Sequence, residues 1–146
     1  MGLKGKLIAS IEVKCGGHSI HDIFHTNAHH VPTISRAFTQ FEIHEGEIVK
    51  IGSIISWNYN DGGQNKFTKQ IIEDIDPHKK SIRWKIIEGD VLEMYNSFTI
   101  AVSCEPQWVT WTIEYEKKTE DTPEPLIELG IILDLNKDIE GHLVKN

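Results

Sequence analysis

The stretch Trp108–Asn146, WVTWTIEYEKKTEDTPEPLIELGIILDLNKDIEGHLVKN, decides the fold because the period of its apolar residues changes once along its length. In the first part, apolar side chains fall at every second position, which is typical of a strand with one buried face. The polar segment Lys117–Pro125 follows. Beyond it the apolar residues recur at helical spacing: Leu126, Leu129, Leu133, Ile139 and Leu143. The sequence therefore predicts a last strand, a short connection and a terminal helix.

The predicted terminal helix begins near Thr122. The Thr122 hydroxyl is a candidate N-cap, Pro123 suits the first helical turn, and Glu124 suits the positive end of the helix dipole. A helix of roughly 20 residues would be about 30 Å long. It is the one large amphipathic segment of the sequence, so it has to cover the apolar surface that the remainder of the chain presents.

The remainder of the chain is mostly strand. Leu3–Val13 alternates between apolar and polar residues and predicts the first strand. Two short helices are predicted next, over His18–His25 and Thr33–Phe38. Turn sequences such as Asn60–Gly63 separate the later strands, so neighbouring strands run antiparallel. These strands are expected at Phe41–His44, Ser53–Tyr59, Lys66–Ile75, Ser81–Glu88, Tyr95–Cys104 and Trp108–Glu116.

A seven-stranded antiparallel sheet has one solvated face and one face that needs cover. Because only the terminal helix can supply that cover, we predict that the sheet curves around it. The fold class is then α+β. A chain of 146 residues is the usual size of one domain, so residues 1–146 are expected to fold as a single unit.

The composition argues against several functional classes. The chain has 15 basic and 22 acidic side chains, a formal charge of −7, and 39% hydrophobic residues. This balance disfavours a nucleic-acid surface, and no apolar run reaches the ~18 residues of a membrane span. Cys15 and Cys104 form no CxxC pattern, and Met1–Lys6 lacks signal-peptide character. We expect a cytoplasmic protein, monomeric or weakly dimeric, without membrane insertion and without a cofactor.

Several short motifs occur in one order along the chain: Gly2–Lys6 (GLKGK), Glu45–Gly46 (EG), Val49–Tyr59 (VKIGSIISWNY), Ile87–Asp90 (IEGD), Thr110–Lys117 (TWTIEYEK), Glu120–Pro125 (EDTPEP) and Lys137–Glu140 (KDIE). Together they resemble the major latex protein-like family, a branch of the plant Bet v I-type, pathogenesis-related superfamily. The resemblance covers nearly the whole chain. It implies the helix-grip (START-like) fold, in which the curved sheet and the C-terminal helix enclose a large apolar cavity and two short helices close one end.

One loop departs from the superfamily pattern. Relatives have a glycine-rich loop between the second and third strands, whereas Glu45–Gly52 contains only two glycines. Without glycine few backbone N–H groups can converge on a phosphate, and Glu45 and Glu47 would repel an anion. Ile48 and Val49 stand where latex-type members often have an aromatic residue. A phosphate-binding role for this loop is therefore disfavoured.

The inward rows of large side chains face one slim helix, and this arrangement leaves a void unless the strands collapse inward. The alternative is a solid core. The family resemblance favours an apolar ligand pocket. Its expected lining is Phe24, Phe38, Ile55, Trp57, Tyr59, Phe67, Gln70, Ile82, Trp84, Ile86, Phe98, Ile100, Trp111, Ile113, Leu129 and Leu133.

Two functional hypotheses remain open. The first is a binding or carrier protein for a hydrophobic plant metabolite of the steroid, flavonoid, fatty acid, alkaloid or terpenoid class, linked to defence or stress. The second, which the resemblance also implies, is a cofactor-independent cyclase, isomerase or elimination enzyme using the same cavity. Candidate acids or bases are His25, Tyr59, Glu88 and Tyr115, and Gln70 could help to orient a ligand.

The histidines suggest one further alternative. His21 and His25 are spaced i, i+4 and could share a metal ion, with His29 and His30 close behind. No set of four ligands is completed, so we predict a polar helix face and a solvated loop, and no metal site. Glu88 is likewise expected to lie in a turn, with its carboxylate bound to backbone N–H groups.

Overall fold

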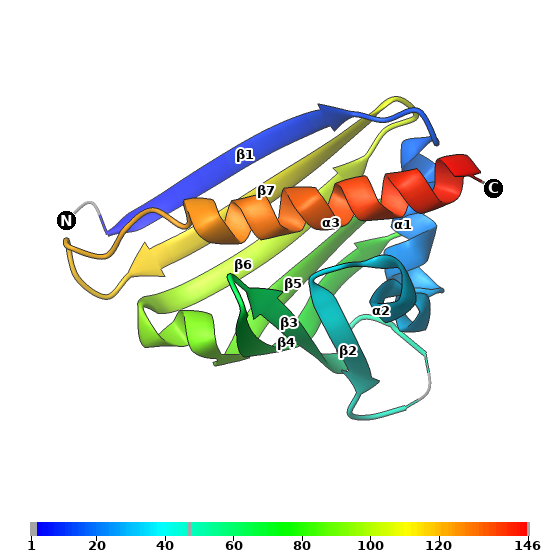
Figure 1. Ribbon diagram of the computed structural model, residues 1–146. Coiled ribbons are helices and arrows are strands. Elements are labelled where there is room, and N and C mark those ends of the chain that lie inside the picture. The colour runs from blue at the N-terminus through cyan, green and yellow to red at the C-terminus, as the bar shows by residue number, and fades with distance from the viewer. Residues whose placement is uncertain (1–2, 47, 146) are drawn as a thin grey trace.

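The computed structural model describes residues 3–46 and 48–145 and has an α+β fold (Figure 1). Strands dominate the first four-fifths of the chain, and one long helix forms the C-terminal part. The elements in chain order are β1 (Lys4–Glu12), α1 (Gly17–His25), the 3₁₀ turn η1 (Ala28–His30), α2 (Val31–Ile34), β2 (Phe38–Ile43), β3 (Ile54–Asp61), β4 (Gln64–Asp76), β5 (Ser81–Gly89), the 3₁₀ turn η2 (Asp90–Glu93), β6 (Tyr95–Cys104), β7 (Trp108–Lys117) and α3 (Leu126–Lys145).

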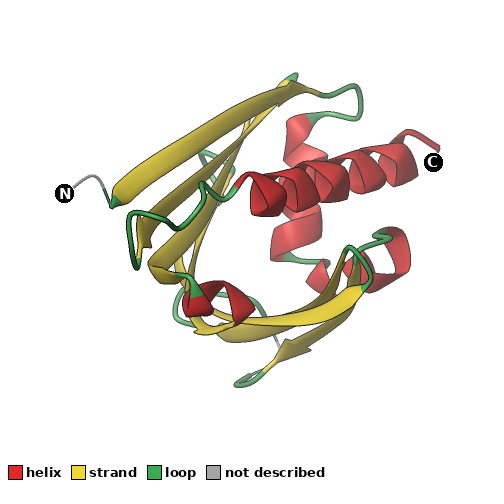
Figure 2. Ribbon diagram, turned by 60° about the vertical axis from the view of Figure 1, so that its left-hand side comes forward, coloured by secondary structure: helices red, strands yellow, loops and turns green. Residues whose placement is uncertain are grey.

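The strands form one seven-stranded antiparallel sheet in the order β1-β7-β6-β5-β4-β3-β2. Consecutive strands from β2 to β7 are neighbours. The last strand, β7, also pairs with the first strand, β1, for example with Tyr115 opposite Gly5. Figure 2 shows the sheet bending around α3, while α1 and α2 lie across one end. The predicted helix-grip arrangement of sheet, terminal helix and two short helices is therefore confirmed.

Irregular strand pairing helps to bend the sheet. The register between β4 and β5 shifts between Lys69 and Gln70 and again between Ile72 and Asp74. Such β-bulges bend a strand and increase its local twist. β4 is also the longest strand, with 13 residues. The sheet can therefore curl around α3 instead of remaining flat (Figure 2).

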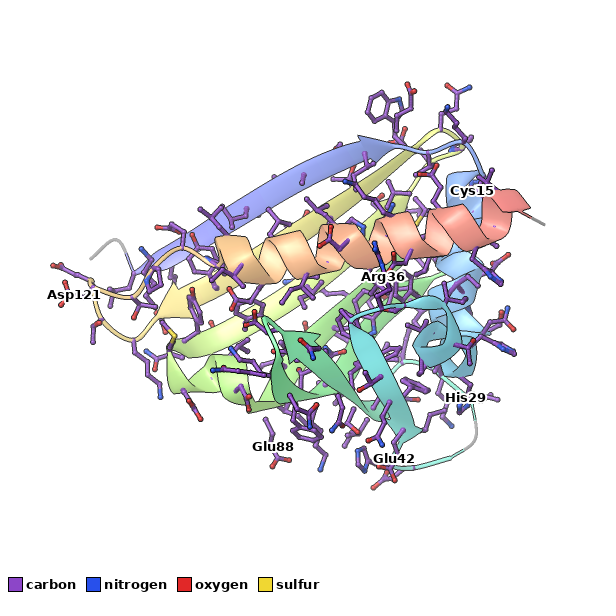
Figure 3. All side chains as sticks on the ribbon, in the orientation of Figure 1. Cys15, His29, Arg36, Glu42, Glu88 and Asp121 are labelled. Atoms are coloured by element: carbon purple, nitrogen blue, oxygen red, sulfur yellow. The ribbon has the colours of Figure 1, made fainter. Side chains whose placement is uncertain are left out.

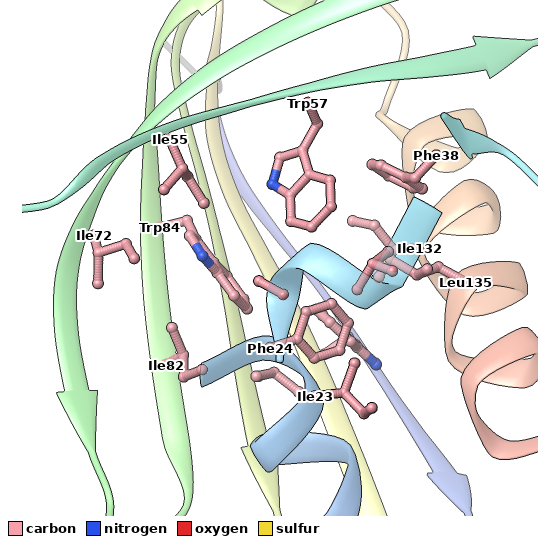
Figure 4. Packing of buried hydrophobic residues seen from close by; sticks show 14 of the residues in the cluster. Ile23, Phe24, Phe38, Ile55, Trp57, Ile72, Ile82, Trp84, Ile132 and Leu135 are labelled. Atoms are coloured by element: carbon pink, nitrogen blue, oxygen red, sulfur yellow. The ribbon is translucent and has the colours of Figure 1, made fainter. Parts of the chain in front are cut away.

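Aromatic side chains fill much of the space between the sheet and the helices. The Phe24 ring of α1 packs edge-to-face against Trp84 and Trp111, with centroids 5.7 and 5.4 Å away. Phe38 packs the same way against Trp57 at 5.6 Å. Figure 4 shows Phe24, Trp84, Trp57 and Phe38 in the interior, beside α3. Each such ring pair is worth about 0.5–1.5 kcal/mol beyond its buried area.

The terminal helix begins later than predicted. Thr122 is not its N-cap: the hydroxyl of this buried residue is 3.4 Å from the carbonyl oxygen of Met94, and α3 begins only at Leu126. The cause is Pro125, because the residue before a proline is driven away from the helical conformation. Glu124 therefore stays outside the helix, and so do the residues that precede it.

The buried face of α3 is also rotated from the predicted one. Its fully buried residues are Ile132, Leu135, Asn136 and Ile139, whereas Leu126 is 63% exposed. The predicted contact residues Leu129 and Leu133 are only half-buried and pack beside the core. Apolar residues occur on more than one side of this helix, so periodicity alone did not define the face.

The second short helix is shorter and earlier than Thr33–Phe38. It ends at Ile34, and Phe38 is already the first residue of β2. The Ser35 hydroxyl oxygen accepts hydrogen bonds from the backbone N–H groups of Ala37 and Phe38, at 3.1 and 2.9 Å. This side-chain bond provides an alternative to helical pairing and ends α2.

Gly17 allows α1 to start directly against the turn between β6 and β7. A Cβ atom at Gly17 would collide with the carbonyl oxygen of Glu105. We expect Gly17→Ala to lower the free energy of unfolding by about 1–3 kcal/mol, the usual cost of overpacking. Chemical denaturation measures this. Gly141→Ala, in an open position of α3, is the control and should raise stability by about 0.5–1 kcal/mol. Equal stability of Gly17→Ala and wild type would contradict the prediction.

Candidate functional site

Two adjoining apolar pockets lie between the concave face of the sheet and α3. Each has a volume of about 40 Å³. Phe38, Gln70, Ile100 and Ile132 belong to both, so these residues separate the two spaces. The first is completed by Tyr59, Thr68, Ile86, Val91, Phe98, Glu128 and Ile131, and the second by Phe24, Trp57, Trp84, Trp111 and Leu135.

The pockets are small for a metabolite site. Ligand pockets usually measure about 300–1,000 Å³, whereas about 15 Å³ of such volume is enough for one water molecule. The resemblance implied a large cavity, whereas each of the two spaces between the sheet and α3 measures about 40 Å³. A metabolite could enter only if side chains, or the helix that carries some of them, moved outward.

Most of the predicted lining residues are brought together. Ten of them line one or both pockets: Phe24, Phe38, Trp57, Tyr59, Gln70, Trp84, Ile86, Phe98, Ile100 and Trp111. Ile55, Ile82 and Ile113 are buried in the surrounding core and border neither space. Leu129 and Leu133 pack at its edge.

Phe67 is a correction to the predicted lining. It lies opposite Asn58 on the outer face of the sheet and is 36% exposed. Its neighbour Thr68 is buried and lines the first pocket, as does Gln70. Gln70 was predicted to face inward and does so, and because residues two apart in a strand share a face, Thr68 faces inward with it and Phe67 faces outward.

The sequence reasoning missed several residues that line the pockets. On α3 these are Glu128, Ile131, Ile132 and Leu135. A signal for this face was present, since Glu128, Ile132, Leu135 and Ile139 follow the alternating spacing of four and three residues that defines one helix face. This face was missed because Glu128, which belongs to it, is polar. The other missed residues are Thr68 of β4 and Val91 of η2.

Four polar residues from three elements line the first pocket. Tyr59 comes from β3, Thr68 and Gln70 from β4 and Glu128 from α3. Burial raises the pKa of the Tyr59 phenol above its usual range, and the nearby carboxylates of Asp90 and Glu128 add to this effect. The phenol therefore keeps its proton at neutral pH and can donate a hydrogen bond to a bound molecule.

The other proposed acids and bases lie outside these pockets. Glu88 is on the outside of the sheet (Figure 3), where its carboxylate pairs with the Lys69 ammonium at 3.1 Å and not with the backbone N–H groups expected for it. The Tyr115 ring is buried and packs edge-to-face against the Tyr95 ring, with the two ring centroids 5.7 Å apart. His25 borders a separate, more polar surface pocket of about 210 Å³ near β2.

The loop that departs from the superfamily pattern is closed by its own contacts. The Ser53 hydroxyl accepts the Lys50 backbone N–H at 2.9 Å and lies 3.3 Å from the Ile48 carbonyl oxygen. The Val49 side chain is buried. Glu47, one of the two residues expected to repel an anion, lies outside the described residues.

The two cysteines show no sign of activation. Burial raises the pKa of Cys104 to about 12, and burial also raises the pKa of the half-buried Cys15. Since the thiolate is the reactive form, neither thiol is prepared for nucleophilic attack. Among residues 3–46 and 48–145, no three His, Cys, Asp or Glu side chains are grouped to hold a metal ion. No helix in those ranges is long and apolar enough to cross a membrane.

Comparison with known proteins identifies the family. The model of the pathogenesis-related protein Bet v 1 family matches residues 2–146. The chain belongs to the Bet v 1 family. MLP-like protein 31 of Arabidopsis thaliana is 36% identical over 97% of this chain and 87% of its own length, which supports the major latex protein-like branch. The chain covers only 44% of MLP-like protein 28 from the same plant, at 34% identity.

Solved structures with the same architecture include a major latex-like protein and an enzyme. Major latex-like protein 151 of Panax ginseng superposes with a TM-score of 0.93 at 38% identity, covering 97% of this chain and 98% of that one. Norcoclaurine synthase of Thalictrum flavum, in complex with dopamine and hydroxybenzaldehyde, has a TM-score of 0.80 at 19% identity, covering 98% and 88%. The second likeness shows the fold alone.

His21 is buried, which corrects the expected polar helix face. It is 1% exposed, and neither ring nitrogen has a hydrogen-bond partner. The Asp22 carboxylate is 3.7 Å from Nδ1, too far for a hydrogen bond. The His25 ring lies edge-to-face to the His21 ring, with the two ring centroids 5.5 Å apart. Burial lowers the pKa of His21, and the positive charges of His25 and Lys80 lower it further, against a smaller opposing effect of Asp22.

This buried imidazole predicts a loss of stability in mild acid. Histidine in the unfolded chain titrates near pH 6.5, whereas folded His21 has a lower pKa. The unfolded state therefore binds more protons below about pH 6.5, so the free energy of unfolding is highest above that pH and falls below it. His21→Phe keeps a ring and removes both nitrogens, so it should flatten the dependence between about pH 7 and 5.

Urea unfolding at a series of pH values measures this dependence. The matched control is His18→Phe, at an exposed position of the same helix α1, which should leave the slope as in wild type. If the free energy of unfolding depended on pH in His21→Phe as it does in wild type, His21 would not be the cause of the loss of stability in acid.

Proposed function

We propose that this protein binds and carries a small hydrophobic metabolite between the sheet and α3. The observation that supports this most is the pair of apolar pockets, the first of which has the polar residues Tyr59, Thr68, Gln70 and Glu128 in its lining. Such a site combines apolar burial, worth about 25 cal/mol per Å², with a few groups that orient the ligand. Steroid, flavonoid, fatty acid, alkaloid and terpenoid molecules have this chemistry, and a defence or stress role in the cytoplasm fits them.

The two halves of α3 are held differently, which indicates how the pockets could enlarge. In the C-terminal half, the Asn136 amide oxygen accepts the Trp111 indole N–H at 3.0 Å, and Asp138 pairs with Arg36 at 3.0 Å. Glu140 also accepts the backbone N–H of Lys14. Among the described residues, no side-chain hydrogen bond or ion pair joins residues 126–133 to the sheet. An outward movement of this N-terminal half would open the first pocket and break no such contact.

Filling the first pocket should weaken binding. Ile131 is half-buried and lines that pocket, whereas Ile127 on the same helix is 64% exposed. We expect Ile131→Trp to raise the Kd of an apolar, environment-sensitive dye at least about tenfold, a loss of about 1.4 kcal/mol. Fluorescence titration measures it. Ile127→Trp is the matched control and should bind as wild type does. Equal binding by all three proteins would place the ligand elsewhere, and no dye binding by wild type would overturn the proposed function.

An enzymatic role is the second candidate, and the Tyr59–Glu128 pair is the observation that favours it. Both residues line the first pocket, and an acid and a base in one pocket are enough for a cyclisation, isomerisation or elimination. The norcoclaurine synthase structure shows that this fold can accommodate catalysis. It adds nothing about the residues of this chain, because the likeness at 19% identity concerns the fold alone.

Tyr59→Phe distinguishes a carrier from an enzyme. For a carrier, loss of one hydrogen bond should weaken binding of a metabolite with a carbonyl or hydroxyl group by about two- to tenfold, or about 0.5–1.5 kcal/mol. Binding of the apolar dye should not change. Native mass spectrometry of protein extracted from plant tissue would supply the metabolite to use. If that metabolite were instead converted, and conversion stopped in both Tyr59→Phe and Glu128→Gln, the carrier function would be wrong.

A further inference from the structure

β1 forms one edge of the sheet, and its outer side has no strand partner among the described residues. Figures 1 and 2 show it along the rim of the fold. The Leu3 carbonyl oxygen accepts the Lys117 N–H, and the Val13 N–H donates to the Gln107 carbonyl oxygen. In an antiparallel pair such bonds recur at every second residue. The odd-numbered residues of β1 are therefore bonded to β7, and the even-numbered residues direct their N–H and C=O groups outward.

The side chains of those even-numbered residues are also exposed. They form the row Lys4, Lys6, Ile8, Ser10 and Glu12, with basic residues at one end and an acidic residue at the other. Ile8 in the centre is 61% exposed. A nine-residue edge strand with free backbone groups and a central exposed isoleucine is a template for pairing with another strand.

We propose that β1 pairs antiparallel with β1 of a second copy of this chain, about a two-fold axis at Ile8. Each Ile8 then lies opposite Ile8 of the partner subunit. Lys4 lies opposite Glu12 of the partner subunit, and Lys6 opposite Ser10 of the partner subunit. In this register each even-numbered residue lies opposite an even-numbered residue of the partner subunit. Because both direct their backbone N–H and C=O groups into the interface, each such pair can exchange two hydrogen bonds. The two sheets become one continuous sheet across an isologous interface.

The side chains fit this register on both faces. On the outer face, opposite charges meet at both ends of the interface, an arrangement that stabilises cross-strand pairs. On the inner face, the half-buried Leu7 lies opposite Ala9 of the partner subunit, and Ile11 lies opposite Gly5 of the partner subunit. A large residue thus faces a small one at each position, so the inner row packs without crowding.

Neighbouring registers fit less well. Moving the two-fold axis to Ala9 places Lys4 opposite Lys14 of the partner subunit, and like charges directly opposite each other destabilise a sheet. Moving it to Leu7 places Glu12 beyond the described part of the partner strand, opposite position 2. Only the axis at Ile8 pairs all nine residues of β1 with all nine of its partner.

The dimer should be weak and concentration-dependent, because a single strand pair is a small interface. Sedimentation velocity should show the mass rising with concentration from that of the 16.7 kDa chain toward twice that value. Glu12→Lys places two lysines opposite each other at both ends and should lower the association constant at least about tenfold. The double variant Lys4→Glu/Glu12→Lys exchanges the charges and should restore wild-type association.

Glu42→Lys is the matched control. It makes the same charge reversal on β2, the strand at the other edge of the sheet (Figure 3), and should leave association as in wild type. A wild-type protein that stays monomeric up to millimolar concentration would overturn the proposal, and so would a double variant that associates as poorly as Glu12→Lys.

Chemical cross-linking tests the register itself. Lys4 and Glu12 are at opposite ends of one strand, roughly 26 Å apart at about 3.3 Å per residue, so a zero-length carbodiimide cannot join them within a chain. We expect a Lys4–Glu12 link between ¹⁵N-labelled and unlabelled chains in a mixed sample, detected by mass spectrometry. A Lys6–Glu12 link in its place would show the axis at Ala9 and refute the register. Neither measurement involves the pockets, so its outcome is independent of ligand binding.

Discussion

One helix has to cover the concave face of a seven-stranded sheet, and the remainder of the structure depends on this constraint. A single helix is about 10 Å wide, much narrower than a sheet whose strands are about 4.8 Å apart. The sheet responds by curving, with bulges along β4, and large rings make up the difference in width. Phe24, Trp84 and Trp111 meet in the space that neither the helix backbone nor the strand backbones can reach.

The same constraint explains why the interior is a candidate binding site although its pockets are small. The large rings leave narrow gaps beside them, and these gaps adjoin α3. The C-terminal half of α3 makes polar contacts with other elements, among them those of Asn136, Asp138 and Glu140. Among the described residues, no side-chain hydrogen bond or ion pair joins its N-terminal half to the sheet, and apolar contacts predominate there. Non-directional contacts can be exchanged for equivalent contacts with a ligand.

The strands and the topology could be predicted because alternation and turn chemistry are local properties. Tyr95–Cys104 was predicted with the bounds that the structure has. The candidate site was predicted less completely, since it depends on which face of each element points inward. On β4 Gln70 was predicted to face inward, but the residue that shares its face at the first pocket is the polar Thr68 and not Phe67, and a pattern of apolar residues does not indicate this. The predicted start of α3 was wrong for another reason. Pro123 was interpreted as a first-turn residue, whereas Pro125 prevents the helix from beginning there.

The rotation of α3 shows why apolar periodicity could not complete the prediction. Leu126, Ile127, Ile131 and Ile132 cover more than one side of the helix, so several rotations would bury similar apolar area. A buried polar pair discriminates between them. The Trp111 indole N–H would be left without a partner if Asn136 turned away, at a cost of about 1–3 kcal/mol. The rotation that satisfies it also directs Glu128 and Ile132 toward the sheet. One hydrogen bond in the middle of α3 thus favours the rotation that sets which residues line the pockets.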